Sequence, residues 1–384
     1  MNQDLGLKIL GQIMNWSDDR AREEFRWLRL MARLKYDGYR DFQAGMRFIE
    51  SLVTWLQQFK PAERETAYGF VRKTLVYIGP NEMQRLVEQF YPGTVRARLI
   101  QTVANERALP TYRVLADPAA RAAIDRLRRQ TLFMGLSDGA RIDIVRHSNA
   151  GLLSNEQLVI ATQVDKEKWR DLLGNLRSDL GDASARFRLV YLIDDFAGTG
   201  TSFFRFNENK QKWTGKLSRF RDSIDAAMEG LGEDGIFSPD WELCVHHYVA
   251  AAGAARAMAE RQQGARAVMN GNGWAKNVHL SFGALLRDDL PIGSIAGRDD
   301  AFIELTKIYY DPILRTKHTD VGGVTHLGLG YGGCALPLVL DHNTPNNAVA
   351  LLWAETDGGD RDGTTAPAMR PLFRRRQRHA EGTA

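Results

Sequence analysis

The segment of residues 190–202, VYLIDDFAGTGTS, constrains this 384-residue chain more than any other. Four apolar residues, 190–193, are followed by the acids Asp194 and Asp195, and then by small and hydroxyl-bearing residues up to Ser202. An apolar run that leads into turn-forming residues predicts a buried strand that opens into a loop. No structural need explains two acids followed by so many glycine and hydroxyl positions, so the pattern predicts a ligand at this loop.

The residue types of the loop suit a ribose 5-phosphate. Asp194 and Asp195 can accept hydrogen bonds from two sugar hydroxyls, and we expect them at a solvent-facing strand end. Small residues allow backbone N–H groups to approach a phosphate closely, and the N-terminus of a following helix favours an anion. The residues expected to hold the 5-phosphate are Ala197, Gly198, Thr199, Gly200, Thr201 and Ser202.

Two other interpretations of this segment were considered. An apolar strand that ends in two acids also resembles a Walker B strand, which requires a phosphate loop of the form G-x-x-x-x-G-K-[ST] elsewhere. The only Gly-Lys pair, Gly215-Lys216, is followed by Leu217 and lacks the upstream glycine, which disfavours a P-loop ATPase. A strand–turn–helix unit without a ligand is the second alternative.

The chain around the loop predicts an α/β protein. From about residue 110, short β-type runs alternate with helical patterns, which is typical of a largely parallel sheet with helices on its faces. Ligands bind such sheets outside the carboxyl ends of the strands. The expected strands are residues 131–136, 157–161, 187–193, 242–248, 278–282 and 348–353.

The chain divides into three parts by pattern. Residues 1–110 show successive helical patterns and no convincing strand, which predicts an all-helical N-terminal domain. Residues 111–355 carry the alternating strands and helices. Residues 356–384, with five arginines between Arg370 and Arg378, predict an irregular basic tail. The helical domain could be a winged-helix variant or a module that binds a protein partner.

A second candidate loop follows the expected strand 131–136. Ser137, Asp138, Gly139 and Arg141 lie there, and these residue types can bind the oxygens of a pyrophosphate, with Gly139 permitting close backbone approach. The alternative is an ordinary Asp-Gly turn in which Ser137 caps a helix.

Polar residues also gather near the C-terminus and at one strand end. His342, Asn343 and Asn346 follow one another closely in DHNTPNN, which favours recognition of a base or sugar, although a plain hairpin loop fits as well. His246 and His247 close another apolar run, and such histidines are more often structural than metal ligands.

The 190–202 loop resembles the signature of the phosphoribosyltransferases: four apolar residues, two acids, an apolar residue, a variable pair, Thr-Gly, one residue, and Thr or Ser. Wider similarity is to a divergent bacterial branch, phosphoribosyltransferase-like effectors of anti-phage conflict systems, some of them encoded beside retron reverse transcriptases. The segments that carry it are residues 63–86, 137–141, 194–202, 342–347 with Trp353, and 371–374.

This resemblance implies a phosphoribosyltransferase-like, Rossmann-like fold that binds phosphoribosyl pyrophosphate (PRPP) or a related nucleotide. It implies catalytic roles for Asp194 and Asp195, with His342, Asn343 and Asn346 on the acceptor side. Mg²⁺ would be held mainly by the ligand, so no metal motif is expected in the sequence. Possible partners are a nucleic acid or a complex of reverse transcriptase and non-coding RNA.

Some members of this family keep the loop and have lost catalysis. The alternative function is therefore a nucleotide-sensing regulator that binds nucleic acid or a protein partner through its N-terminal helices. The two cysteines, Cys244 and Cys334, are too few for a disulfide scaffold, and no long apolar run indicates a signal peptide or a membrane span. We therefore expect a cytoplasmic protein.

Overall fold

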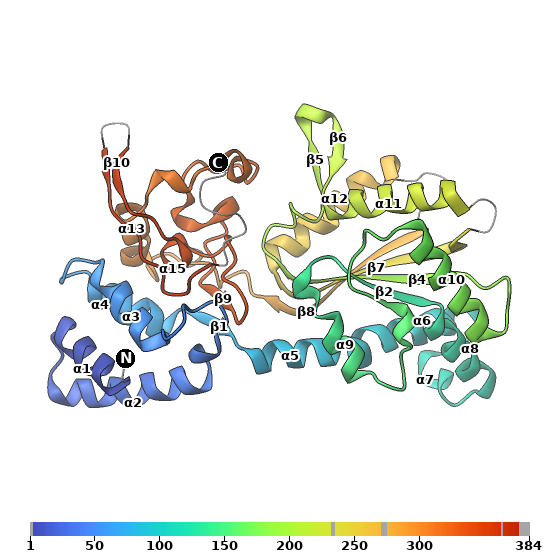
Figure 1. Ribbon diagram of the computed structural model, residues 1–384, viewed down its shortest axis with the longest axis horizontal. Helices are drawn as coiled ribbons and strands as arrows, with labels where there is room; N and C mark the ends of the chain where they lie inside the picture. The colour runs from blue at the N-terminus through green and yellow to red at the C-terminus, as the bar shows by residue number, and fades with distance from the viewer. Residues whose placement is uncertain (1–2, 232–234, 270–274, 362–363, 376–384) are drawn as a thin grey trace. The chain divides into compact units, whose positions relative to one another are not determined.

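The computed structural model describes residues 3–231, 235–269, 275–361 and 364–375, and it divides into two compact units (Figure 1). Unit 1 combines residues 1–83 with residues 287–384, and unit 2 consists of residues 84–286. Within the described residues, no helix is both long and apolar enough to cross a membrane. The expected boundaries at residues 110 and 355 fall inside these units rather than between them.

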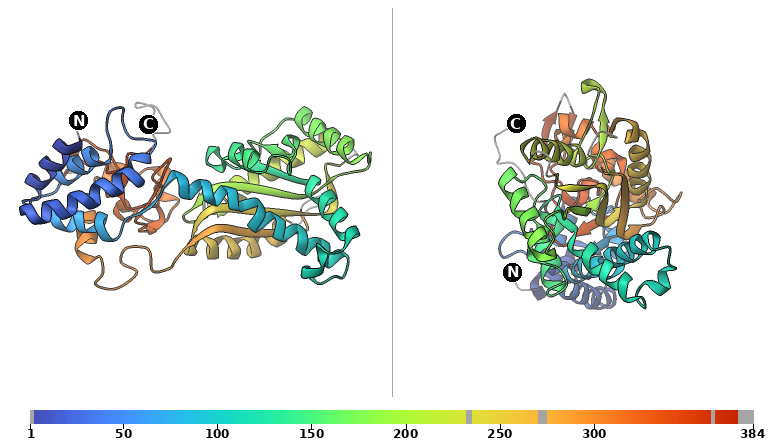
Figure 2. Two further views of the ribbon diagram at one scale, coloured as in Figure 1. Left: turned by 90° about the horizontal axis from the view of Figure 1, so that it is seen from below. Right: turned by 90° about the vertical axis from the view of Figure 1, so that its right-hand side faces the viewer.

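Unit 2 is built on a five-stranded sheet of order β3-β2-β4-β7-β8, in which every neighbouring pair is parallel. Helices flank this sheet, as two further views show (Figure 2). The expected mostly parallel α/β sheet is confirmed. The strands are β2 (Thr131–Gly135), β3 (Leu158–Val159), β4 (Phe187–Ala197), β7 (Phe237–Ala251) and β8 (Asn277–Leu286).

β4, β7 and β8 are longer than predicted, whereas β2 and β3 are shorter. All of β2 is buried, as are residues 189–194 of β4. The helices of unit 2 are α5 (Pro80–Gln89), which begins in unit 1, α6 (Arg96–Glu106), α7 (Thr111–Val114), α8 (Pro118–Arg129), α9 (Ile142–Ser148), α10 (Lys166–Leu180), α11 (Lys216–Leu231) and α12 (Ala252–Met269), together with a π-helical turn, η2 (Phe90–Val95).

Residues 84–110 belong to unit 2, whereas the sequence placed them in the N-terminal helical domain. The reason is aromatic packing against the sheet. The ring of Phe90 lies 6.0 Å from that of Phe133 and 5.4 Å from that of Tyr191, in edge-to-face geometry. The ring of His246, on the adjacent strand β7, lies 4.6 Å from the ring of Phe90. This segment therefore covers the sheet.

Unit 1 joins the two ends of the chain. Its helices are α1 (Gln3–Ile13), α2 (Asp18–Leu34), α3 (Phe48–Gln57), α4 (Arg64–Lys73), α13 (Asp300–Ile308), α14 (Lys317–Asp320) and α15 (Ala350–Trp353). Ser17 is the N-cap of α2, since its side chain accepts a hydrogen bond from the N–H of Arg20.

Two expectations about unit 1 were wrong. Residues 1–110 do contain a strand, β1 (Val76–Ile78), which pairs in parallel with β9 (Leu338–Leu340). Residues 348–353 were expected to form a strand, but the last four form α15. Residues 348–352 are all buried. An apolar run that is buried on every side shows no hydrophobic periodicity, so the sequence pattern cannot distinguish a helix from a strand there.

The C-terminal segment is not irregular as far as residue 375. β10 (Gly359–Arg361) and β11 (Thr364–Ala366) form an antiparallel pair. Beyond it, Phe373 is fully buried in unit 1 and stacks on Phe42 and Phe48 at centroid distances of 5.8 and 5.7 Å. Leu372 and Phe373 therefore belong to the core of unit 1, whereas residues 376–384 lie outside the described residues.

Candidate functional site

The carboxyl ends of β2 and β4 lie side by side, because Gly135 pairs with Ile193 in the sheet. This register brings the loop after β2 onto the two acids. Ser137 Oγ donates a hydrogen bond to Asp194 Oδ1, and the N–H of Gly139 donates to Ser137 Oγ at 3.2 Å. The two loops that the sequence predicted separately thus form one cluster.

Gly139 is required by close packing in this cluster. A Cβ atom at this position would lie 2.5 Å from the carboxylate of Asp195, closer than any real contact allows. Tyr248 holds the same loop from β7, since its hydroxyl donates to the carbonyl of Ala140 at 2.8 Å. Arg141 follows in a left-handed backbone conformation, with φ of 49°, and is buried. The loop is therefore fixed against the acids.

Asp194 is not at a solvent-facing position, which corrects the sequence-based expectation. Its residue is only 3% exposed, and its Oδ2 forms an ion pair with Lys216 Nζ. Burial raises the pKa of Asp194 to about 6, although Lys216 opposes the change. Asp195 is more exposed and adds to the rise in the Asp194 pKa.

Lys216 is the site residue that sequence reasoning missed. It begins α11 and is separated from the 190–202 segment by a hairpin of β5 (Arg205–Asn207) and β6 (Lys212–Thr214). Hydrogen bonds close the base of this hairpin, from the Lys216 N–H to Ser202 O at 3.0 Å and from the Leu217 N–H to Phe203 O at 3.1 Å. α11 therefore begins beside the 190–202 loop, although the β5–β6 hairpin lies between them in the sequence.

The glycine before Lys216 makes that closure possible. Gly215 has φ of 127°, and a Cβ atom there would collide with the carbonyl of Phe203. No residue with a side chain fits this position without moving the backbone. The Gly-Lys pair, which the sequence offered only as a failed phosphate-loop match, thus has a different role.

The predicted phosphate loop is a compact turn at the end of β4. Thr199 Oγ1 and Thr201 Oγ1 lie 2.8 Å apart, and the N–H of Thr201 donates to Thr199 Oγ1 at 3.3 Å. Gly200 is left-handed, with φ of 68°. Arg261 of α12 donates to the carbonyl of Thr199 at 2.9 Å, which brings a second unpredicted cation to the loop. Ala197 is buried, and Ser202 is exposed.

His246 and His247 are buried within β7. Burial lowers the pKa of His246 to about 3 and that of His247 to about 4, so both rings are neutral at physiological pH. His246 Nδ1 lies 2.9 Å from Ser281 Oγ on the adjacent strand. Among the residues that the structure describes, no three His, Cys, Asp or Glu side chains are grouped closely enough to hold a metal ion.

The three residues expected on the acceptor side belong to unit 1, whereas the 190–202 loop belongs to unit 2. His342 Nδ1 lies 3.0 Å from Asp341 Oδ1, and Arg40 Nε lies 3.3 Å from the other oxygen of this buried carboxylate. The intervening Thr344 bonds to the carbonyl of Phe373 at 3.1 Å. Within unit 1, these contacts connect the segment after β9 to Arg40 and to the C-terminal segment.

Acids at the end of one parallel strand, a compact Thr-Gly turn after them and a Ser-Gly loop on the neighbouring strand define a phosphoribosyltransferase-like protein. A comparison with protein families supports this class, since the family model PRTase-CE matches residues 52–375. The chain belongs to the PRTase-CE family. No curated protein and no solved structure matched the chain.

The raised pKa of Asp194 predicts how stability depends on pH. A carboxyl whose pKa is higher in the folded than in the unfolded state contributes stability that is full below the unfolded value and is lost as pH rises through the folded value. For Asp194 these values are 3.8 and about 6. Between pH 4 and pH 7 the wild type should therefore lose about 3 kcal/mol relative to Asp194→Asn.

Chemical denaturation of both proteins across this pH range measures the difference. The variant keeps a side chain of the same shape that cannot ionise, so other titrating groups cancel in the comparison. A stability difference that stays constant from pH 4 to pH 7 would contradict the assignment of a buried, ionising Asp194.

Proposed function

We propose that unit 2 binds PRPP or a related ribose 5-phosphate nucleotide at the carboxyl ends of β2 and β4. The observation that carries the proposal is the direct contact between the two loops: Ser137 bonds to Asp194, and Gly139 packs on Asp195. A ribose bound at the acids would then have its C1 substituent near the Ser137 loop and its 5-phosphate near the Thr199 turn.

In this proposal each group has a chemical role. The carboxylates of Asp194 and Asp195 accept hydrogen bonds from the ribose hydroxyls, and such charged bonds contribute more than neutral ones. The residues that would hold the 5-phosphate are Ala197, Gly198, Thr199, Gly200, Thr201 and Ser202. Those that would hold the pyrophosphate are Ser137, Asp138, Gly139 and Arg141.

The residues of this cluster suit a Mg²⁺ ion that is held mainly by the phosphates of its ligand and needs few protein oxygens. Mg²⁺ keeps several waters and takes few protein oxygens when it is bound with phosphates. Asp195 offers one carboxylate, whereas Lys216 already neutralises Asp194. When bound, Mg²⁺ would balance the charge of the pyrophosphate, with Asp195 as its neighbour in the protein.

If the site turns over, the bond between C1 and the pyrophosphate oxygen breaks and the sugar becomes positively charged. The protein contributes mainly by positioning the reactants and by placing charge near them. In this proposal the negative charge of Asp195 would stabilise such a sugar, Asp194 would accept hydrogen bonds from its hydroxyls, and the 137–141 loop would hold the leaving pyrophosphate. A nucleotide sensor would use the same contacts without this bond cleavage.

A thermal-shift experiment tests the proposal. PRPP with Mg²⁺ should raise the melting temperature of the full-length chain more than ribose 5-phosphate or pyrophosphate alone, because only PRPP engages both loops. Release of pyrophosphate in the presence of candidate bases or nucleotides then separates an enzyme from a sensor. A melting temperature unchanged by all three compounds would contradict both the enzyme and the sensor.

Gly139→Ala supplies a second test at this site. The added methyl group must displace the Asp195 carboxylate, so PRPP affinity should fall by about tenfold or more while the fold is retained. Gly174→Ala is the matched control, because Gly174 lies within α10 and a Cβ there meets no atom within 4 Å. Wild-type affinity in Gly139→Ala would mean that Asp195 does not contact the ligand.

The proposal extends to a role as an effector in a bacterial anti-phage system. Its support is the resemblance described above, and the segments 137–141, 194–202, 342–347 and 371–374 that carry it all lie within the family match. Expression with the neighbouring genes should lower phage plaque counts, and Asp195→Asn should restore them. Plaque counts that do not depend on this chain would contradict the role without affecting PRPP binding.

A further inference from the structure

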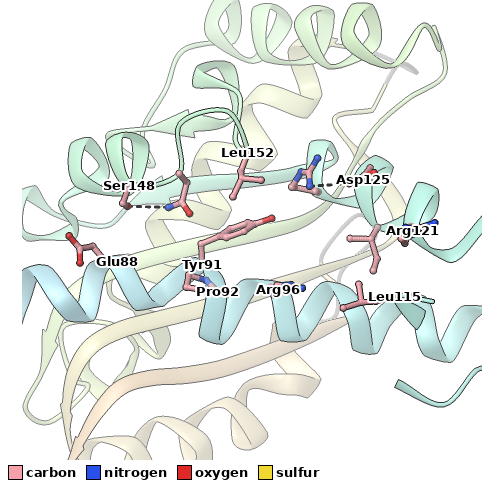
Figure 3. A pocket seen from close by; sticks show the side chains of 12 residues that line it. Glu88, Tyr91, Pro92, Arg96, Leu115, Arg121, Asp125, Ser148 and Leu152 are labelled. Carbon is pink, nitrogen blue, oxygen red and sulfur yellow. Dashed lines mark hydrogen bonds and ion pairs between the residues drawn. The ribbon is translucent and has the colours of Figure 1, made fainter. Parts of the chain in front are cut away.

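Unit 2 has a pocket that shares no residue with the proposed PRPP site. Its volume is about 550 Å³, which lies within the ~300–1,000 Å³ typical of small-molecule sites, and it is bounded by η2, α6, α8 and the end of α9 (Figure 3). Arg128, one of its lining residues, lies three residues before the start of β2, whereas the proposed PRPP site lies beyond the opposite, carboxyl end of β2. The pocket is therefore a separate site.

A π-helical turn shapes one wall of this pocket. Pro92 has no N–H, so it cannot form the α-helical hydrogen bond to the carbonyl of Glu88. Four residues later, the N–H of Arg96 donates to the carbonyl of Tyr91, five residues earlier in the chain, which is the hydrogen bond of a π-helix. This wider turn places Tyr91, Pro92 and Arg96 together on the wall, and the Tyr91 ring projects into the pocket (Figure 3). Turns of this kind are frequent at functional sites.

The charges of the pocket favour an anion. Its two acids are already engaged: Asp125 pairs with Arg128 at 3.0 Å, and Glu88 accepts a hydrogen bond from Gln84 at 2.8 Å. Arg96 and Arg121 form no ion pair with any acid in the part of the chain that the structure describes. Two guanidinium groups at one pocket can bind a phosphate group through several charged hydrogen bonds.

The remaining lining favours a flat, apolar ring that carries an amino group. Leu115 and Leu152 are 42% and 48% exposed, which is unusual for leucines that line a hollow beside a tyrosine ring. Asn149 is buried, and its amide nitrogen donates to Val145 O at 2.8 Å and to Ser148 Oγ at 3.2 Å. Its Oδ1 atom is left as an acceptor.

We infer that this pocket binds a nucleoside monophosphate whose base carries an exocyclic amino group. The phosphate would lie between Arg96 and Arg121, the base would pack on Tyr91, Leu115 and Leu152, and its amino group would donate to Asn149 Oδ1. The net charge of the lining, three arginines against two acids, suits a monophosphate better than a more highly charged nucleotide.

Isothermal titration of full-length Asp195→Asn with AMP, CMP and UMP tests this inference. This background weakens the proposed PRPP site, where a mononucleotide could also bind, so that binding at the pocket is measured separately. One equivalent of AMP or CMP should bind, and UMP, which has no amino group on its base, should bind about tenfold more weakly.

Adding Arg96→Gln and Arg121→Gln should lower the affinity for AMP by about tenfold to a hundredfold, since charged hydrogen bonds are lost. Leu152→Glu, a change at an exposed residue, should lower it as well. The matched control is Arg85→Gln with Arg107→Gln, two exposed arginines of the same region that do not line the pocket.

In an otherwise wild-type chain, the pocket variants should bind PRPP with unchanged affinity. Absence of mononucleotide binding to folded Asp195→Asn would overturn the inference. Binding that survives both Arg96→Gln/Arg121→Gln and Leu152→Glu would overturn it as well.

Discussion

Asp195→Asn is expected to lower the affinity for PRPP by about tenfold to a hundredfold, which is the loss of one or two charged hydrogen bonds. The substitution keeps the shape of the side chain and removes only its charge. Asp195 is less buried than Asp194. Its replacement should therefore leave the melting temperature almost unchanged, which separates a ligand-binding role from a structural one.

Asp143→Asn is the matched control for this experiment. Asp143 is an exposed acid in the first turn of α9, close to the 137–141 loop in sequence but outside both predicted loops. Its replacement changes the net charge of the region by the same amount, so it reports any long-range effect of charge on a polyanionic ligand. Equal losses of affinity in the two variants would mean that Asp195 acts only through its charge at a distance.

Lys216→Met is expected to lower the free energy of unfolding by about 3–5 kcal/mol at pH 8, the usual cost of removing one partner of a buried ion pair. The Asp194 carboxylate would be left buried without its cation. Loss of Lys216 should also raise the pKa of Asp194 above its present value of about 6, since the lysine now opposes the effect of burial. Protonation then relieves the cost, so the destabilisation should be smaller at pH 5.

A double-mutant cycle isolates this interaction. Lys216→Met combined with Asp194→Asn should recover much of the stability at pH 8, because neither variant position then carries an unpaired charge. Lys210→Met, at an exposed lysine of the β5–β6 hairpin, is the control for loss of a positive charge. A Lys216→Met protein as stable as the wild type at pH 8 would contradict a structural ion pair.

The sheet and the loop could be predicted because their signals are local. The apolar residues before Asp194 and the small residues after it lie next to one another in the sequence, so residue order alone places the acids at a strand end. The sequence predicted the two loops separately, and the structure joins them because their parallel strands end at the same edge of the sheet. The contact of Ser137 with Asp194 shows this.

What the sequence did not reveal depends on contacts between distant segments. Lys216 reaches Asp194 only because the β5–β6 hairpin returns the chain to Ser202, and no local pattern reports such a closure. Unit 1 is discontinuous, and its β1–β9 pair joins residues more than two hundred positions apart. A division of the chain by local composition cannot find a unit of this kind.

The central claim is that the clustered loops of unit 2 bind PRPP, and isothermal titration of the full-length protein with PRPP and Mg²⁺ tests it most directly. We expect one PRPP per chain at the β2–β4 site, with an affinity that exceeds that of ribose 5-phosphate and that falls at least tenfold in Asp195→Asn. A folded wild-type protein that takes up no PRPP, or that binds it equally well after Asp195→Asn, would contradict the claim.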